Sequence, residues 1–280
     1  MFLGLQRRGH PASAAIRSVT RAHSTLQSGS LLRVATYNIH KGVRGLGPRK
    51  RLEIHNLVLG IEALDADMVF LQEVHNFHRA EARRFPDTHG GWPRLPQAEY
   101  LAPEGYAVAY RTNAVTRHGE HGNALLSRWP LGEAGHHDVS DHRFEQRGLL
   151  HVPVQWNSIT LHAVVAHLGL MHAGRVRQVE RLARFIEAEV PRDALLIVAG
   201  DFNDWGEKLD APMRRCGLHR AIVEGAPPAR FNTFPSRVPV FSLDRIYMRG
   251  LRCVSTSVPR GVAWARMSDH LPLVAELELP

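Results

Sequence analysis

The sequence is poor in cysteine and has no long apolar run, and both absences limit what the protein can be. Cys216 and Cys253 are the only cysteines among 280 residues, which excludes a disulfide-dense secreted scaffold and a zinc site built from several cysteines. One disulfide between them is possible, but two free thiols in a reducing cytosol are the simpler interpretation. No apolar stretch approaches the roughly 20 residues that a membrane-spanning helix needs, so we expect no transmembrane segment.

Acidic residues are missing from the first 52 positions, which contain ten Lys or Arg. The net charge of the whole chain is +8, but residues 53–280 carry the remaining 25 basic residues and all 27 acidic ones, a net charge of −2. The total charge therefore does not argue for nucleic-acid binding. The basic cluster at 44–51 could still contact phosphates, although a solvated loop is its simpler interpretation.

Residues 1–30 are rich in Arg, Ser and Ala and lack the continuous apolar core of a secretory signal. We expect a disordered basic leader, a targeting segment of mitochondrial type, or residues upstream of the true start, and we expect a cytoplasmic protein. The rest of the chain contains no stretch typical of an interdomain linker. With 44% apolar residues overall it can bury a substantial core, so residues 31–280 are expected to form one domain.

Hydrophobic patterning predicts more strands than helices. Helices are expected over 52–64 and 175–190, where apolar residues recur at helical spacing. The segment 75–105 is polar and contains several Pro and Gly, which is typical of an irregular surface loop. Strands are expected at 31–38, 68–74, 106–110, 123–129, 149–155, 159–167, 194–200, 242–248, 253–258 and 271–279. The pattern indicates a two-sheet core with helices outside, without fixing the topology.

Polar residues at or near the ends of apolar strands are the candidates for chemistry, because sites are commonly built at the rim of a sheet. Each has an ordinary explanation when taken alone, such as a turn, a helix cap or an ion pair. Together, several carboxylates with two asparagines and two histidines match the needs of a divalent cation and a phosphate. Oxygen ligands favour Mg²⁺, with Mn²⁺ as a substitute, and the lack of thiolate clusters and of a His-x-x-x-His pair makes zinc less natural. The candidates are Asn38, Glu73, His167, Asp201, Asn203, Asp244, Asp269 and His270.

Seven short motifs resemble, in this order, those of the endonuclease/exonuclease/phosphatase (DNase I-like) superfamily. They are TYNIHKG (36–42), LQEV (71–74), HGNALLSRWP (121–130), AHLGL (166–170), GDFNDW (200–205), LDRIY (243–247) and SDH (268–270). The resemblance covers about residues 31–279 and is strongest to the compact bacterial members. It implies a mixed α/β fold: a four-layered αββα sandwich of two packed mixed sheets flanked by helices.

The resemblance also implies ligands for a metal and a phosphate. Glu73 resembles the principal Mg²⁺ ligand, and Asn38 the asparagine that helps hold the metal and phosphate. Asp269 resembles a carboxylate that either binds the metal directly or contacts one of its ligands. Candidate phosphate contacts are Lys41, Asn123, Arg128, Arg147 and Arg245. For Lys41 and for each arginine taken singly, a surface or ion-paired cation is the simpler interpretation.

The remaining motif residues resemble groups that move protons or stabilise charge. Asp201 resembles the carboxylate that orients or deprotonates the attacking water, and Asn203 a residue that stabilises the phosphate. His270 matches the histidine at the scissile phosphate, with Asp244 as its orienting partner. His167 resembles the second histidine of the DNase I-like and sphingomyelinase branches, a candidate general acid. The implied reaction is metal-assisted hydrolysis of a phosphoester by water, without a covalent intermediate.

Two departures argue against a dedicated abasic-site repair enzyme: His40 stands where those enzymes carry an acid, and they lack the histidine that matches His167. Three hypotheses remain open: a Mg²⁺-dependent nuclease, a phospholipid or small-molecule phosphodiesterase or phosphatase, and a non-catalytic binding module on the same fold. Peripheral membrane contact is possible, and we expect a monomer. Trp92, Trp129 and Trp205 could stack on bases or sit at a membrane interface, or simply pack.

Overall fold

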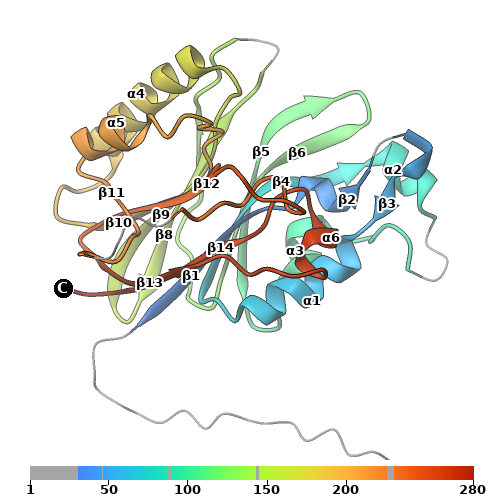
Figure 1. Cartoon of the computed structure of the whole chain (residues 1–280), viewed down its shortest axis with the longest axis horizontal. Coiled ribbons are helices and arrows are strands. Elements are labelled where there is room, and N and C mark those ends of the chain that lie inside the picture. Colours follow the sequence, from blue (N-terminus) through green and yellow to red (C-terminus); the bar gives the residue numbers. More distant parts are fainter. Residues whose placement is uncertain (1–30, 46, 87–89, 143–144, 226–229) are drawn as a thin grey trace, which may run out of the picture.

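Two six-stranded sheets pack face to face, with helices on both outer faces (Figure 1). The computed structural model describes residues 31–45, 47–86, 90–142, 145–225 and 230–280. The mixed α/β class and the layered sandwich expected from the resemblance are confirmed. The leader expected over 1–30 lies outside the described residues, and the division into leader and domain stays a prediction.

The first sheet is mixed, because β1 and β4 run parallel while the other pairs are antiparallel. Its order is β13 (Arg252–Ser257), β14 (Leu273–Glu278), β1 (Leu32–Asn38), β4 (Met68–His78), β6 (Gly119–Ser127), β5 (Ala107–Thr116). The turn η1 (His40–Gly42) leads into a short hairpin of β2 (Val43–Arg44) and β3 (Arg51–Leu52), and the turn η2 (Gly47–Arg49) lies between these two strands.

The second sheet is also mixed, with one parallel pair, β9 and β10. Its order is β11 (His219–Arg220), β12 (Asp244–Arg249), β10 (Leu195–Asp201), β9 (Ile159–His167), β8 (Gly148–Trp156), β7 (Gly135–Asp138). Because β1 and β10 meet across the core, the carboxyl ends of the two parallel pairs come to the same rim of the sandwich.

Three apolar clusters hold the layers together, since burial of apolar surface is the main favourable term in folding. One lies between the sheets and includes Phe70, Trp156 and Ile197. The others lie between each sheet and its own helices. The first sheet is covered by α1 (Ile54–Leu64), α3 (Gln97–Leu101) and α6 (Trp264–Met267), and the second by α4 (His172–Glu189) and α5 (Asp210–Arg215).

The segment 75–105 is not the irregular surface loop that its composition indicates. Strand β4 continues to His78, α2 (Arg79–Arg84) follows, and α3 packs on the sheet. Trp92 is only 8% exposed, and Gln97 is buried. Gln97 donates to the carbonyl of Lys41 over 2.8 Å and accepts from the backbone N–H of His75 over 2.8 Å. This segment therefore braces the loop that follows β1.

Both cysteines are free thiols. In the described part of the chain, no helix has the length and apolar composition that crossing a membrane would require.

Candidate active site

The candidate site forms where strands from both sheets end at one rim of the sandwich. Asn38, His167 and Asp201 are the last residues of β1, β9 and β10, and Asp244 is the first residue of β12. Strand register pairs Asp201 with His167 on one side and with Asp244 on the other. Glu73 lies at a register irregularity of β4 against β6, and such bulges re-aim a side chain. The strand order therefore collects these five residues.

Asp201 lies at the centre of the site and is 2% exposed. Its Oδ2 accepts from Asn38 Nδ2 over 3.1 Å and lies 3.6 Å from His167 Nε2 and 3.7 Å from His270 Nε2. Its Oδ1 accepts from the backbone N–H of Asn203 over 2.9 Å. Burial raises the pKa of Asp201 to about 7. The carboxylate is thus poised to exchange a proton near neutral pH.

His270 is held as a cation by two aspartates. Its Nδ1 lies 2.8 Å from Asp244 Oδ2, which also accepts from Thr233 Oγ1 over 2.6 Å. Burial alone would lower the pKa of His270, but Asp244 and then Asp201 outweigh it and raise the pKa to about 10. For His167, burial dominates and holds the pKa well below its usual value. One histidine is therefore an imidazolium in the free protein, and the other is neutral.

Glu73 presents a buried carboxylate oxygen that has no hydrogen-bond partner among the described residues. Its Oε1 accepts from Asn38 Nδ2 over 3.4 Å, and Oε2 is the unpartnered atom. Lys41 Nζ lies 3.4 Å from Oε2 and His40 Nδ1 lies 3.9 Å from it, while His40 Nδ1 is 3.3 Å from Asp269 Oδ2. Burial would raise the pKa of Glu73, but the positive field of the surrounding histidines and lysine lowers it. The donor set and the orphaned oxygen fit a hard divalent cation.

Four residues of the site have a left-handed backbone that non-glycine residues seldom adopt. The φ angles are 44° at His40, 61° at Lys41, 56° at Glu73 and 48° at Asn203. Such conformations persist only where the surrounding structure holds them, and they concentrate at functional sites.

The described residues contain one group of three whose potential metal-binding atoms all lie within 4.8 Å of one another: Asp201, Asp244 and His270. We assign this group to proton handling. Asp244 Oδ2 already accepts from His270 and from Thr233, and two accepted bonds occupy the lone pairs of that oxygen. Its Oδ1 has no hydrogen-bond partner among the described residues, but the Asp244 side chain has no exposed surface, whereas that of Glu73 is 18% exposed. The unpartnered oxygen of Glu73 is the better place for a cation.

A family model, the Endonuclease/Exonuclease/phosphatase family, matches residues 35–270, from within β1 to His270. The chain belongs to this family. The resemblance inferred from the motifs is thereby confirmed, and with it, at the level of the family, a phosphoester hydrolase.

Relatives and solved structures agree with this family. The protein YbhP of Escherichia coli K12 is 36% identical over 255 residues, which is 88% of this chain and 96% of YbhP. An endonuclease/exonuclease/phosphatase from Beutenbergia cavernae superposes with a TM-score of 0.70 at 23% identity, over 89% of this chain and 72% of that one. D. rerio TDP2, solved with a single-strand DNA product, gives 0.62 at 19% identity, over 89% and 99% of the two chains. A mannosyl-6-phosphatase of Bacteroides thetaiotaomicron gives 0.61 at 18% identity, over 88% and 99%.

Lys41 and Arg147 are the two predicted phosphate contacts that lie beside the site of this family member. Arg147 makes a 3.3 Å ion pair with Glu145, while its Nε is buried without a partner. Arg147 is also, after burial, the next largest contributor to the lowered pKa of His167. Both cations lie near the site, and their role as phosphate contacts stays a prediction.

Asn123 does not serve as predicted. Its side chain is fully buried, and its amide donates to the carbonyls of Gly148 and Val165 over 2.9 Å and 3.2 Å. Both N–H groups are used to tie β6 to the opposite sheet, so neither is available to a phosphate.

The prediction for Arg245 is wrong. Successive side chains of a strand point to opposite faces, so Arg245 points away from the side of β12 on which Asp244 meets His270. It is fully buried, 3.1 Å from Asp204 Oδ2 and 3.0 Å from Asp210 Oδ1. These two carboxylates neutralise the charge of Arg245.

The suggestion for Arg128 is also wrong. The guanidinium pairs with Asp65 and with Asp67, the latter at 3.1 Å. These aspartates precede β4, at the end of the strand opposite to Glu73. A phosphate at the site cannot reach it.

Three side chains that the sequence did not single out complete the site. Thr233 holds Asp244, and nothing in the sequence marks it. Ser268, within the SDH motif, donates to the carbonyl of Asn38 over 2.7 Å. The ring of Phe234 lies 4.9 Å from that of His270; its position in the aromatic pair of FNTF is a weak signal.

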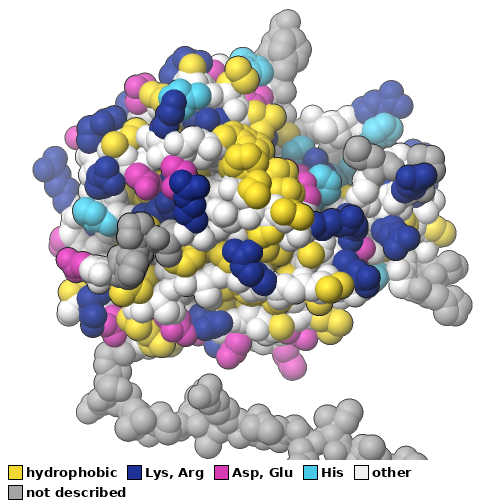
Figure 2. Space-filling view, viewed as in Figure 1, with side chains coloured by type: hydrophobic (Ala, Val, Ile, Leu, Met, Phe, Trp, Pro, Cys, Tyr) yellow, Lys and Arg dark blue, Asp and Glu magenta, His cyan; other side chains and the backbone are white. Residues whose placement is uncertain are grey.

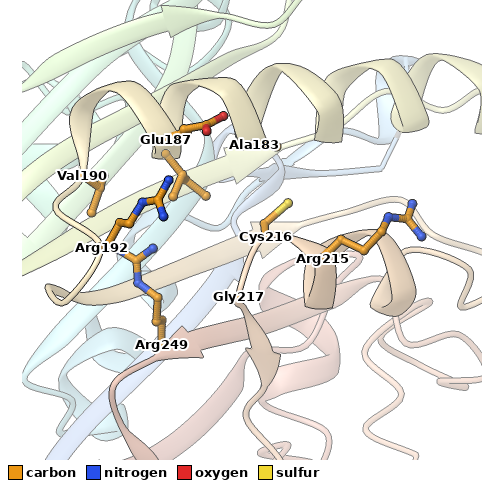
Figure 3. Close-up of a pocket in the computed structure, with 9 residues that line it drawn as sticks. Ala183, Glu187, Val190, Arg192, Arg215, Cys216, Gly217 and Arg249 are labelled. Atoms are coloured by element: carbon orange, nitrogen blue, oxygen red, sulfur yellow. The ribbon is translucent and has the colours of Figure 1, made fainter.

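A separate hollow of about 430 Å³ lies between α4 and α5, away from the site (Figure 3). It is lined by Arg192, Arg215, Arg249 and Cys216. Arg249 donates to the carbonyls of Ala194 and Pro191, in the loop that follows α4, and the residues lining the hollow include no aspartate or histidine.

Proposed function

We propose that the protein is a divalent-metal-dependent phosphodiesterase that uses water as its nucleophile. The observation that carries this proposal is the position of the Asp201 carboxylate, whose Oδ2 lies close to side-chain nitrogens of Asn38, His167 and His270. The unpartnered oxygen of Glu73 lies beside this group. This buried cluster contains a base, a cation site and two imidazoles, the groups that hydrolysis of a phosphate diester requires.

Glu73 and Asp269, with Asn38 beside them, would hold the cation, Mg²⁺ or Mn²⁺. When bound, that ion neutralises phosphate charge and polarises the phosphorus–oxygen bond. Asp201 takes the proton of the attacking water, and its pKa near 7 matches this task. The hydroxyls of Thr233 and Ser268 are committed elsewhere: Thr233 donates to Asp244 and Ser268 to a backbone carbonyl. This supports direct attack by water over a covalent intermediate.

His270 stabilises the negative charge that grows on the phosphate oxygens, because Asp244 keeps it protonated. Asn203 stabilises the same charge from the adjacent turn. His167 protonates the leaving oxygen; it is neutral in the free protein, so it takes up its proton as the anionic phosphate binds. Lys41 and Arg147 attract and position the phosphate.

The test is hydrolysis of bis(p-nitrophenyl) phosphate and p-nitrophenyl phosphate with Mg²⁺, Mn²⁺ or EDTA. We expect metal-dependent cleavage of the diester and a loss of about 100-fold or more in His270→Ala, since removal of an acid–base or charge-stabilising group costs this much. His219→Ala, an exposed histidine on edge strand β11, is the matched control and should keep full activity. Monoester-only turnover would make the protein a phosphatase, and turnover unaffected by EDTA and by His270→Ala would refute the proposal.

A second observation favours a phospholipid head group as the substrate. The loops that surround the site expose large apolar side chains, including Met171 at 71%, Val262 at 69% and Val238 at 68% exposure. Figure 2 shows a hydrophobic band across the middle of this face with Lys and Arg on either side. Apolar side chains beside cations are typical of surfaces that bind anionic lipid interfaces. The exposed apolar side chains of these loops also include Leu170, Trp205, Val240 and Phe241.

This substrate class is tested by sedimentation with vesicles of phosphatidylglycerol and phosphatidylcholine, and by assay of phosphodiester cleavage in them. The double variant Val238→Glu/Val262→Glu should lose binding and lipid cleavage while keeping bis(p-nitrophenyl) phosphate activity. Leu59→Glu, equally exposed at 62% on α1, is the control. Failure to bind the vesicles, together with cleavage of plasmid or oligonucleotide DNA, would favour the nuclease.

A further inference from the structure

The imidazole of His40 lies between two carboxylates that belong to different parts of the chain. His40 Nδ1 is 3.3 Å from Asp269 Oδ2, which lies just before β14, and 3.9 Å from Glu73 Oε2 in β4. Ligand atoms that share a six-coordinate ion at about 2.1 Å stand roughly 3 Å apart. Both distances from Nδ1 approach that spacing, so the ring stands beside both carboxylates of the proposed cation site.

The backbone is arranged so that this ring is held in place. His40 and Lys41 both have left-handed φ angles. The N–H of His40 donates to Asn38 Oδ1 over 3.0 Å, and the carbonyl of Lys41 accepts from buried Gln97 over 2.8 Å. Because both ends of this strained turn are hydrogen-bonded, the His40 side chain is held in position. Backbone strain of this kind is retained mainly at functional sites.

We infer that His40 Nδ1 is a ligand of the metal ion held by Glu73 and Asp269, and that this nitrogen makes the site prefer Mn²⁺ to Mg²⁺. The inference rests on the proposed metal site and adds a ligand and a metal preference to it. Imidazole nitrogen suits transition ions, whereas Mg²⁺ takes oxygen ligands almost exclusively. The unpartnered Glu73 Oε2 supplies the anionic oxygen beside it.

The opposing interpretation makes His40 a cation that only neutralises the two carboxylates, as Lys41 does at 3.4 Å from the same Glu73 oxygen. The two interpretations predict opposite changes in metal affinity when the His40 ring is removed. Removing a ligand weakens metal binding, whereas removing a competing cation strengthens it. Lys41→Met is therefore the matched control, and it should tighten the binding of both ions.

The variants are chosen to tolerate the left-handed backbone. Glycine adopts positive φ without strain, and Asp tolerates it better than most residues. His40→Gly removes the ring, while His40→Asp replaces nitrogen with oxygen. Thermal unfolding of each variant without metal checks that the fold is kept.

Calorimetry should show that His40→Gly weakens Mn²⁺ binding at least 10-fold, the effect expected for groups around a metal, and narrows the Mn²⁺/Mg²⁺ affinity ratio. His40→Asp should restore Mg²⁺ binding but not the preference for Mn²⁺. In electron spin-echo spectra of the Mn²⁺-loaded protein, a ¹⁴N coupling should be present in the wild type and lost in both variants.

The inference is overturned if His40→Gly binds Mn²⁺ as tightly as the wild type or more tightly, or if the ¹⁴N coupling persists. Failure of the proposed function has a different signature: wild type that binds neither ion, or Glu73→Gln that binds both as well as the wild type.

Discussion

Asp201 is the residue on which the proposed chemistry depends, because four groups meet its two oxygens. Asn38 and Asn203 donate to it, while His167, at the end of β9, and His270, in the loop before β14, both approach its Oδ2. Its burial makes the neutral form accessible at neutral pH. We therefore expect the Asp201 carboxylate to act mainly as a proton acceptor.

Asp201→Asn should therefore abolish activity without unfolding the protein. The amide keeps the shape of the carboxylate and still accepts from the Asn203 N–H, but it cannot take a proton from water. We expect the turnover of bis(p-nitrophenyl) phosphate to fall by about 100-fold or more, with the melting temperature nearly unchanged. Activity within tenfold of the wild type would remove Asp201 from the role of base.

At the scale of the elements, β9 and β10 approach so closely at the site that one position excludes any side chain. A Cβ added at Gly200 would lie 1.7 Å from the carbonyl oxygen of Ala166. Gly200 directly precedes Asp201, the proposed base, and Ala166 directly precedes His167, the proposed acid. The pairing of the two strands thus sets the spacing of base and histidine.

Gly200→Ala should separate the strands and lower both stability and activity. Overpacking of this kind costs about 1–3 kcal/mol, and the displacement of the strand ends should remove most turnover. Denaturant unfolding and the diester assay measure the two effects. Gly206→Ala, whose new Cβ would meet only the flexible side chain of Lys208 at 3.3 Å, is the control. A Gly200→Ala protein of wild-type stability and turnover would contradict the argument.

The loop after β10 is fastened to β12 by a buried ion pair. Arg245 and Asp204 are both without exposed side-chain surface, and Asp210 and the Tyr247 hydroxyl complete the network. Removing one partner leaves a buried charge unpaired, which is far more costly than losing a pair at the surface.

Arg245→Met should lower the free energy of unfolding by about 3–5 kcal/mol. Arg128→Met, which breaks an exposed pair, should cost about 1 kcal/mol or less. Chemical denaturation of both variants separates a structural arginine from a surface one. Equal, small losses would show that the buried network does not hold the loop.

At the scale of the whole molecule, buried neutral histidines link stability to pH. Burial lowers the pKa of His75 to about 3 and that of His121 and His151 to about 4. Their ordinary value is 6.5. The unfolded chain therefore binds more protons than the folded one between about pH 6.5 and 4, so the stability falls as the pH is lowered through that range.

The melting temperature should therefore decrease steadily from pH 7 to pH 4. His151 makes a 2.9 Å bond to His162 on the outer face of the second sheet, far from the catalytic strand ends. His151→Gln removes one titrating group and should flatten the profile while leaving activity unchanged. A variant with the same slope as the wild type would show that His151 does not contribute to the pH dependence.

The sequence by itself determined the family, the positions of the main strands and helices, and the candidate residues that the structure brings together at one site. Apolar alternation is local, so β1, β10 and α4 could be located from it. Asp201, His270 and Glu73 stand in motifs whose order along the chain is distinctive. These features depend on neighbours in sequence, which is why they were predictable.

Only the tertiary structure decided which polar residues are available to a ligand. Arg245 and Asn123 were predicted to bind phosphate. Residues tens of positions away in the sequence already pair with the guanidinium of Arg245 and accept from the amide N–H groups of Asn123. Thr233 and Gln97 brace the site from segments with no motif. Contacts between distant segments depend on how the two sheets pack, and no local pattern records that packing.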